Sequence, residues 1–144
     1  MGSGPTPKQV EITCQVDDRG FLYQIYGNFA FPSLRRIYVV GNFSRKIIRG
    51  LHRHNEEWKG YFVVRGAAKF VVVDEQKKTT SYVLSYRKPS VLIVPPKYSH
   101  GWVSLTDHTM IIGLSNKTLE ESVKDDIRED PFVLGEELWN VKSR

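Results

Sequence analysis

The sequence predicts an all-β protein, built as a sandwich or a barrel. Short runs rich in Val, Ile, Tyr and Phe recur along most of the chain, and turn-forming Gly, Pro, Asn and Asp residues separate them. Several of these runs alternate apolar and polar residues, which is typical of strands with one buried face. Only near the carboxyl end does the spacing of the apolar residues change to that of a helix.

The beginning of the chain is expected to supply three strands. Val10, Ile12 and Cys14 alternate with polar residues, and a turn signal that includes Asp17 and Gly20 follows them. A second alternating run carries aromatic residues on both faces, and a third apolar run ends in another turn. The predicted strands are 9–15, 21–27 and 34–41.

The middle of the chain is expected to form the main sheets. Gly66 separates two β-rich runs, a polar tip follows at 75–78, and Pro95 and Pro96 end a short apolar run. The regular spacing of these short runs supports a sandwich or barrel. The predicted strands are 47–54, 60–65, 67–74, 79–86, 90–94, 101–105 and 109–114.

The carboxyl end is expected to form a short surface helix over 117–128. Leu119, Val123 and Ile127 recur there every four residues among charged residues, and Pro131 follows. The tail beyond the helix supplies apolar side chains that can cover a sheet. These are Phe132, Leu134, Leu138 and Trp139.

Length and composition describe an ordinary globular protein. The chain has 144 residues, of which 40% are hydrophobic and 26% charged, so we expect one domain over 9–144 after a flexible segment over 1–8. No apolar run approaches the roughly 18 residues that a membrane span needs. The single cysteine, Cys14, gives neither a disulfide framework nor a zinc-binding spacing. These features predict a cytoplasmic protein without a membrane partner.

The net charge of +5 does not indicate a nucleic-acid partner. The basic residues lie singly or in short pairs across separate predicted turns, whereas nucleic-acid-binding proteins more often carry a basic stripe or a recognisable module. A smaller anion, such as a diphosphate, fits a few convergent arginines better.

Three of the four histidines are candidates for a functional site. His52 and His54 are two residues apart, so their side chains project to the same face of a strand. His100 stands at the start of a later strand, where a folded-back sheet can bring it against the first pair. Two such histidines and a distant third on an all-β chain have the layout of a cupin barrel. His108 stands alone in a turn and is expected to be structural.

Such a histidine cluster has three uses. Neutral imidazoles can bind a divalent metal, a histidine can act as a general base because its ordinary pKa of about 6.5 lies near neutral pH, or the rings can be hydrogen-bonded core residues. Metal-binding cupins usually add a glutamate a few residues after the pair, but Glu56 and Glu57 follow too closely. Lys59 lies near the usual position and would repel a cation. We therefore expect no metal; the ligands of a metal-dependent alternative are His52, His54 and His100.

Seven short segments give the chain a family resemblance. In their order along the chain they resemble the dTDP-4-dehydrorhamnose 3,5-epimerase family, and the similarity extends from about residue 18 to 131. The RGLH segment, together with the following lysine and VVRG, is the most specific part. The segments are DRGF (18–21), NFSR (42–45), RGLH (49–52), Lys59 with VVRG (63–66), VD (73–74), PP with HG (95–101), and DDI with DP (125–131).

The resemblance implies a fold and a function. Its members are homodimeric double-stranded β-helix (jelly-roll) cupins that need no metal or cofactor and act on a nucleotide-linked 4-keto-6-deoxyhexose. By position, His52 matches the base that removes a proton next to the ketone, and Lys59 matches the lysine that stabilises the enolate. Arg49, Arg19 and Asn42 match positions that bind the nucleotide diphosphate. The expected chemistry is therefore epimerisation of a sugar nucleotide, as in polysaccharide biosynthesis.

One geometric condition applies to this assignment. Arg49 and His52 are three residues apart, so both can face one cavity only if Gly50 breaks the alternation of the strand at a β-bulge. Trp102 lies close to His100 and is a further candidate for contact with the base or sugar, although an aromatic residue in a barrel wall more often packs in the core.

The chain also departs from the epimerase pattern. Residues 116–118, Asn-Lys-Thr, stand where the family carries a tyrosine acid. The His-x-His pair is closer to the related dTDP-sugar 3,4-ketoisomerases, whose pre-site strand resembles residues 37–40 and makes Tyr38 a candidate proton-transfer group. His54 or His100 would then be the second proton-transfer or hydrogen-bonding group. The carboxylate that orients His52 stays open among Asp74, Asp107, Asp125 and Asp126.

Three alternatives to the epimerase therefore stay open. The first is a 3,4-ketoisomerase, and the second is a cupin that binds a sugar nucleotide without turning it over. The third is a small metal-dependent cupin.

Overall fold

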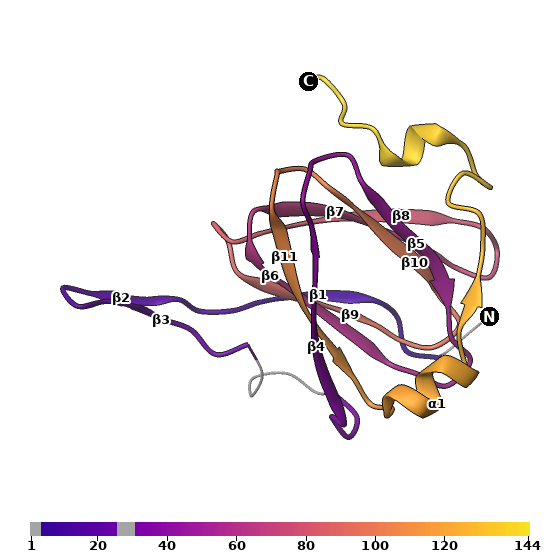
Figure 1. Cartoon of the computed structure of the whole chain (residues 1–144), viewed down its shortest axis with the longest axis horizontal. Coiled ribbons are helices and arrows are strands. Elements are labelled where there is room, and N and C mark those ends of the chain that lie inside the picture. The colour runs from indigo at the N-terminus through magenta and orange to yellow at the C-terminus, as the bar shows by residue number, and fades with distance from the viewer. Residues whose placement is uncertain (1–3, 26–30) are drawn as a thin grey trace.

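The computed structural model describes residues 4–25 and 31–144 and confirms the all-β prediction. Ten strands form two antiparallel five-stranded sheets, which pack face to face (Figure 1). In order across the first sheet, the strands are β1 (Lys8–Glu11), β9 (Ser90–Val94), β6 (Lys59–Arg65), β11 (Thr109–Ser115) and β4 (Arg36–Asn42). The second sheet contains β12 (Ile127–Arg128), β5 (Ile48–Arg53), β10 (Ser99–Ser104), β7 (Ala67–Val73) and β8 (Thr79–Ser85).

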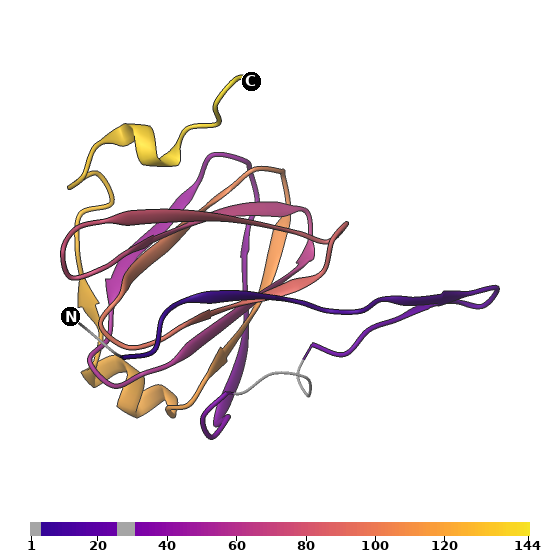
Figure 2. The ribbon, with the colours of Figure 1, turned by 180° about the vertical axis from the view of Figure 1, so that it is seen from behind.

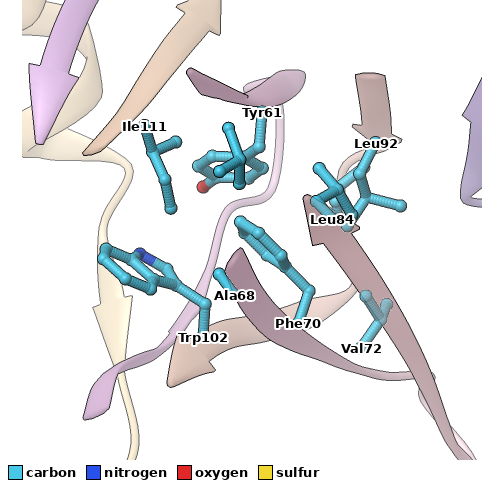
Figure 3. Packing of buried hydrophobic residues seen from close by; sticks show 10 residues of the cluster. Tyr61, Ala68, Phe70, Val72, Leu84, Leu92, Trp102 and Ile111 are labelled. Atoms are coloured by element: carbon cyan, nitrogen blue, oxygen red, sulfur yellow. The ribbon is translucent and has the colours of Figure 1, made fainter. Parts of the chain in front are cut away.

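The main hydrophobic cluster lies between the two sheets (Figure 3). Phe70 and Trp102 from the second sheet lie with ring centroids 6.2 Å apart, and Tyr61 from the first sheet lies 5.0 Å from Phe70. Aromatic pairs at such distances add to the free energy gained from burying their surface. The core thus packs the two sheets against each other.

The first predicted strand is two separate strands. β1 pairs with β9 only as far as Glu11, and residues 15–17 form β2 (Gln15–Asp17) in a hairpin with β3 (Gly20–Leu22). The hairpin extends away from the barrel in two opposite views, so its side chains are exposed (Figures 1 and 2). The predicted strand 21–27 was thus placed correctly at its start, but residues 26–30 lie outside the described part of the chain.

The predicted helix is shorter than its apolar spacing indicates. Helix α1 (Leu119–Lys124) begins with a capping box between Thr118 and Glu121 and ends at Asp125. Ile127 was assigned to the helix wrongly, because it belongs to β12, whose backbone pairs with the free edge of β5. Leu119 and Val123 are 66% and 69% exposed, so the apolar face of the helix is not buried within the chain.

The tail covers the second sheet, as predicted. Trp139 is buried at the end of a 3₁₀-helix, η1 (Glu136–Trp139), against Leu51 and Val71, and its indole N–H donates to the Pro131 carbonyl over 2.8 Å. Phe132 is the exception, since 46% of its surface is exposed. No helix within residues 4–25 and 31–144 is long and apolar enough to cross a membrane.

A bulge in β5 places the functional residues. The register between β5 and β10 shifts from the pair His52–His100 to the pair Arg49–Trp102, as the sequence predicted for Gly50. Gly50 has a φ of 127°, and a Cβ on it would lie 2.6 Å from the Cα of Gly101. Only glycine fits this close crossing. Because of the bulge, Arg49 and His52 both line the same cavity.

Candidate active site

A pocket of about 720 Å³ opens between the two sheets, and α1 forms part of its rim. The first sheet contributes polar side chains from β4 and β6, and the second contributes them from β5, β10 and β12. From the first sheet these are Arg36, Tyr38, Lys59 and Tyr61. From the second they are Arg49, His52, His54, His100 and Arg128. The three predicted histidines therefore converge in one pocket.

The carboxylate of Asp126 lies next to the His52 ring. Its Nδ1 lies 3.4 Å from Oδ1 of Asp126, which directly follows the helix, and this oxygen has no hydrogen-bond donor among the described residues. Oδ2 of Asp126 accepts a hydrogen bond from Arg128 over 2.8 Å. Protonation of Nδ1 toward Asp126 leaves Nε2 of His52 free to accept a proton from a ligand. Burial lowers the pKa of His52 and outweighs the opposite effect of Asp126, so the imidazole is neutral at neutral pH.

His100 is held in one tautomer by two neighbours. Its Nδ1 lies 3.2 Å from the carbonyl oxygen of Tyr98, which can only accept, so Nδ1 carries the proton. Its Nε2 then accepts from the Tyr61 hydroxyl over 2.7 Å. Burial holds the pKa of His100 well below its ordinary value. His100 is thus a buried, neutral hydrogen-bonding residue.

His54 is fixed in a similar way. Its Nδ1 lies 2.9 Å from the carbonyl oxygen of Asp125, and its ring lies parallel to that of His52 with centroids 6.5 Å apart. The Asp125 carboxylate does not face the histidines. It accepts three backbone N–H bonds from residues 55–57, so it shapes the loop after β5.

Lys59 provides the positive charge on the opposite wall. Its ammonium donates to the Tyr38 hydroxyl over 3.1 Å and lies 3.3 Å from Oε2 of Glu57, a carboxylate whose side chain is fully buried. The Arg36 guanidinium lies over the ring of Tyr38 at 5.1 Å. The His52 imidazole on one wall therefore lines the same pocket as an ammonium and a phenol on the other.

The four predicted substrate-binding residues have different surroundings. Arg49 lines the pocket, whereas Asn42 is only 3% exposed. The amide oxygen of Asn42 accepts a hydrogen bond from Arg49 over 2.7 Å, and its amide nitrogen donates to the Ile47 carbonyl and the Ser104 hydroxyl. Asn42 does not line the pocket, and its amide oxygen holds Arg49 in place. Trp102 lines the pocket while packed on the core. Arg19 lies outside the pocket at the tip of the β2–β3 hairpin, paired with Asp17.

The convergent histidines do not form a metal site. Among the described residues, no three His, Cys, Asp or Glu side chains are arranged to hold a metal ion. Both ring nitrogens of His100 already contact protein atoms, and the Lys59 ammonium lines the same pocket. The residues present therefore do not fit a bound divalent cation.

Several polar residues of the site were not singled out from the sequence, including Arg36 and Arg128, which line the pocket. Asp126 was one of four open candidates, and only the pairing of β12 with β5 brings it beside His52. Glu57 was considered only as a metal ligand, and Tyr61 was included in a strand without a role. Tyr61 could have been found by alternation, because Lys59 and Tyr61 are two apart and share a face of β6.

The profile of the family described as dTDP-4-dehydrorhamnose 3,5-epimerase matches residues 6–134. The chain belongs to this family. Over 106 residues it is 31% identical to the dTDP-4-dehydrorhamnose 3,5-epimerase of Escherichia coli strain K12, and the aligned part covers 63% of this chain and 57% of that enzyme. The match thus extends over little more than half the length of that family member.

Solved structures of an epimerase and a ketoisomerase share the fold. The dTDP-4-dehydrorhamnose 3,5-epimerase of Bacillus anthracis, with TDP and PPi bound, is 26% identical, with a TM-score of 0.81 over 95% of this chain and 86% of that chain. The QdtA 3,4-ketoisomerase of Thermoanaerobacterium thermosaccharolyticum is 23% identical, with a TM-score of 0.73 over 86% of this chain and 88% of that chain. The predicted cupin jelly roll is therefore confirmed.

Proposed function

We propose that the protein removes and returns a proton next to the ketone of a nucleotide-linked 4-keto-6-deoxyhexose. The observation that carries this proposal is the opposition of two groups in one pocket. His52, backed by Asp126 at 3.4 Å, comes from one sheet, and Lys59, bonded to Tyr38 at 3.1 Å, comes from the other. Membership of the epimerase family supports the same chemistry.

His52 acts as the general base in this proposal. Nε2 takes the proton from the carbon beside the ketone, the electron pair of the C–H bond forms the enolate double bond, and the carbonyl electrons move to oxygen. Asp126 stabilises the imidazolium that results. Such a base typically contributes about 10²–10⁴-fold to the rate.

Lys59 stabilises the enolate. An ammonium has three N–H donors, and contacts with Glu57 and Tyr38 engage two of them. The third can donate to the developing oxyanion, a contribution of about 10²–10³-fold in comparable sites. Because the ketone of the substrate itself accepts the electrons, this step needs no cofactor.

Arg49 is the proposed contact for the diphosphate. Its Nε is anchored on Asn42 and one terminal nitrogen donates to the Gly41 carbonyl over 3.0 Å, so the guanidinium is held at the pocket wall with donors to spare. A planar guanidinium suits the oxygens of a phosphate. The Bacillus anthracis epimerase, solved with TDP and PPi bound, supports a nucleotide ligand for this pocket.

A 3,4-ketoisomerase is the second candidate, because Tyr38 is the phenol paired with Lys59. Residues 116–118, which stand where the family carries a tyrosine acid, have other contacts: Asn116 accepts from the Trp58 backbone, and Thr118 caps α1. Tyr38 then takes the place of the missing acid, and His54 is the further proton-transfer group.

The proposed assembly is a homodimer in which the β2–β3 hairpin reaches a second copy of the chain. Val16 and Phe21 on the hairpin are 75% and 71% exposed, and β4, an edge strand, exposes Ile37 and Val39. Such apolar surfaces are usually covered by a partner. Arg19, whose contact within the chain is with Asp17, would then bind the nucleotide diphosphate in the partner's pocket. A cytoplasmic location and a role in polysaccharide biosynthesis complete the proposal.

NMR of dTDP-4-keto-6-deoxyglucose in deuterated buffer tests the proposed function. Deuterium should enter the sugar at carbon 3 or 5 faster than without enzyme, and the product separates epimerisation from movement of the ketone. His52→Ala should abolish this exchange and leave dTDP affinity nearly unchanged. Retained exchange in that variant would refute the role of His52, and tight binding without exchange by the wild type would indicate a binding protein.

A further inference from the structure

We propose that Glu57 is a positioning residue that holds the Lys59 ammonium against Tyr38 and toward the substrate. The inference rests on the proposed function, because Lys59 is the group that would stabilise the enolate. Glu57 lies in the loop before β6, two residues from Lys59, and it does not line the pocket. It therefore acts on the reaction through its neighbours.

Glu57 is a buried carboxylate with an unusually complete set of partners. Only 1% of the residue is exposed. Oε1 accepts from the Ser122 hydroxyl over 2.7 Å, and Oε2 accepts from the Ser115 hydroxyl. A buried charge is costly unless it is paired and hydrogen-bonded, and these hydrogen bonds offset part of that cost for Glu57.

Three positively charged or titratable groups surround the same carboxylate. Lys59 Nζ and Arg36 lie 3.3 and 3.4 Å from Oε2, and Nδ1 of His54 lies 3.5 Å from Oε1. Burial acts to raise the pKa of Glu57, but Lys59, the two serine hydroxyls and His54 together lower it below its ordinary value. Glu57 is thus ionised, and it is surrounded by Arg36 from β4, Lys59 from β6 and His54, which directly follows β5.

A clamp is needed because a lysine side chain has four rotatable bonds. The Lys59 residue is 7% exposed, and its ammonium is held between Glu57 and the Tyr38 hydroxyl, 3.3 and 3.1 Å away. These two contacts fix its direction, and no other described residue accepts its third N–H. A cation preorganised in this way does not have to reorient as charge develops on the substrate.

Residues 116–118 also contribute to the contacts that hold Glu57. Ser115 precedes this segment and Ser122 lies in the helix that follows it, and both hydroxyls donate to Glu57. Between them, Thr118 caps α1, and its carbonyl accepts from Arg36 over 3.1 Å. The segment before α1 and the helix itself thus hold Glu57 and Arg36 in place, and Glu57 in turn contacts Lys59.

Glu57→Gln tests the inference, with Glu56→Gln as the matched control. The Glu56 side chain is 77% exposed and pairs only at the surface, with Lys117, so its replacement should leave exchange and unfolding unchanged. Glu57→Gln should slow deuterium exchange into the sugar about 10- to 100-fold, because a small displacement of a catalytic group has effects of this size. Its affinity for dTDP should stay within about twofold, since Arg49 holds the diphosphate independently.

A double-mutant cycle separates positioning from general structural damage. If Glu57 acts through Lys59, adding Glu57→Gln to Lys59→Gln should change the exchange rate less than about twofold. Multiplicative effects in the double variant would overturn the inference. If Glu57→Gln does not fold, Glu57→Asp replaces it, because this variant keeps the charge but withdraws it from Lys59. Its exchange rate should lie between those of the wild type and Lys59→Gln. A wild-type rate would overturn the inference.

A crystal structure of Glu57→Gln gives a result that needs no substrate. The Lys59–Tyr38 hydrogen bond should be lost there and kept in Glu56→Gln. An unchanged Lys59 would refute the inference even if the wild type exchanges no proton. If the wild type exchanges no proton but Lys59 is displaced in the variant, the proposed reaction is refuted and the positioning role of Glu57 is supported.

Discussion

Replacing Asp126 with asparagine removes one charge from behind the proposed base and changes almost no volume. The Asp126 carboxylate lies 3.4 Å from Nδ1 of His52, and the two side chains are 21% and 29% exposed. When His52 takes a proton from the substrate, its ring becomes positive beside this carboxylate. The variant therefore measures how much Asp126 stabilises that charge.

The expected loss follows from Coulomb's law. Two unit charges 3.4 Å apart interact by about 1.2 kcal/mol at the dielectric constant of water and about 5 kcal/mol at an effective value of 20. The partly exposed pair lies between these limits, so Asp126→Asn should slow deuterium exchange by about 10- to 10³-fold. Binding of dTDP should be unchanged, because Arg49, the proposed contact for the diphosphate, is held by Asn42 and Gly41.

The pH profile of the exchange rate provides the second measurement. Burial lowers the pKa of His52, and Asp126 is the strongest influence that raises it. Exchange should be lost as the pH falls through this pKa, because protonated His52 cannot act as a base. In Asp126→Asn the pKa falls further, so the acid limb should move to lower pH. A variant that folds and binds dTDP but keeps the wild-type rate and acid limb would refute the pairing.

Two predictions concern stability, and both are measured by urea unfolding. Tyr61→Phe should lower the free energy of unfolding by about 1–3 kcal/mol, because the buried Nε2 of His100 loses its 2.7 Å hydrogen bond. The control is Tyr86→Phe, at a tyrosine that is 48% exposed. Equal losses in the two variants would contradict the reasoning. Burial depresses the pKa of His100 in the folded protein, whereas in the unfolded chain it returns to about 6.5. Protons therefore bind the unfolded chain more tightly, and His100 should lower the free energy of unfolding of the wild type by about 1.4 kcal/mol between pH 7.5 and 5.5. An unfolding free energy that does not change over this range would show that His100 is not buried in a neutral form.

Local signals in the sequence were sufficient where a single residue determines the backbone. The double proline ends β9 at Val94, as predicted, and Gly66 separates β6 from β7. Gly50 was expected to form a bulge because Arg49 and His52 had to share a face, and the register shift lies there. These predictions depend on one residue and its immediate neighbours.

Long-range pairing was the part that the sequence could not supply. Apolar residues every four positions favour a helix to residue 128, but the open edge of β5 pairs with residues 127–128 instead. The same pairing places Asp126 beside His52. Likewise, nothing local distinguishes Glu56, which is largely exposed, from Glu57, which is buried, since the difference depends on serines more than fifty residues away.

The position of the proposed groups on opposite sheets has a consequence for the product. His52 belongs to β5 in the second sheet, and Tyr38 and Lys59 belong to β4 and β6 in the first. Under the proposed function, a sugar ring bound between the two walls presents one face to His52 and the other to Tyr38. Removal of a proton by His52 gives a planar enolate, and delivery of a proton by Tyr38 from the opposite wall inverts the carbon.

If instead the ketone moves, the histidines remove the proton from carbon 3 and return one to carbon 4, while the hydroxyl proton on carbon 3 passes to the oxygen on carbon 4, a transfer for which Tyr38 is the proposed group. Tyr38→Phe distinguishes the two routes, because it removes the phenol but keeps the ring beneath Arg36 and beside Lys59. Loss of inverted product with continued solvent exchange would assign Tyr38 as the acid of an epimerase. Loss of ketone movement would instead assign Tyr38 to the ketoisomerase route, and an unchanged product would exclude Tyr38 from proton transfer in both routes.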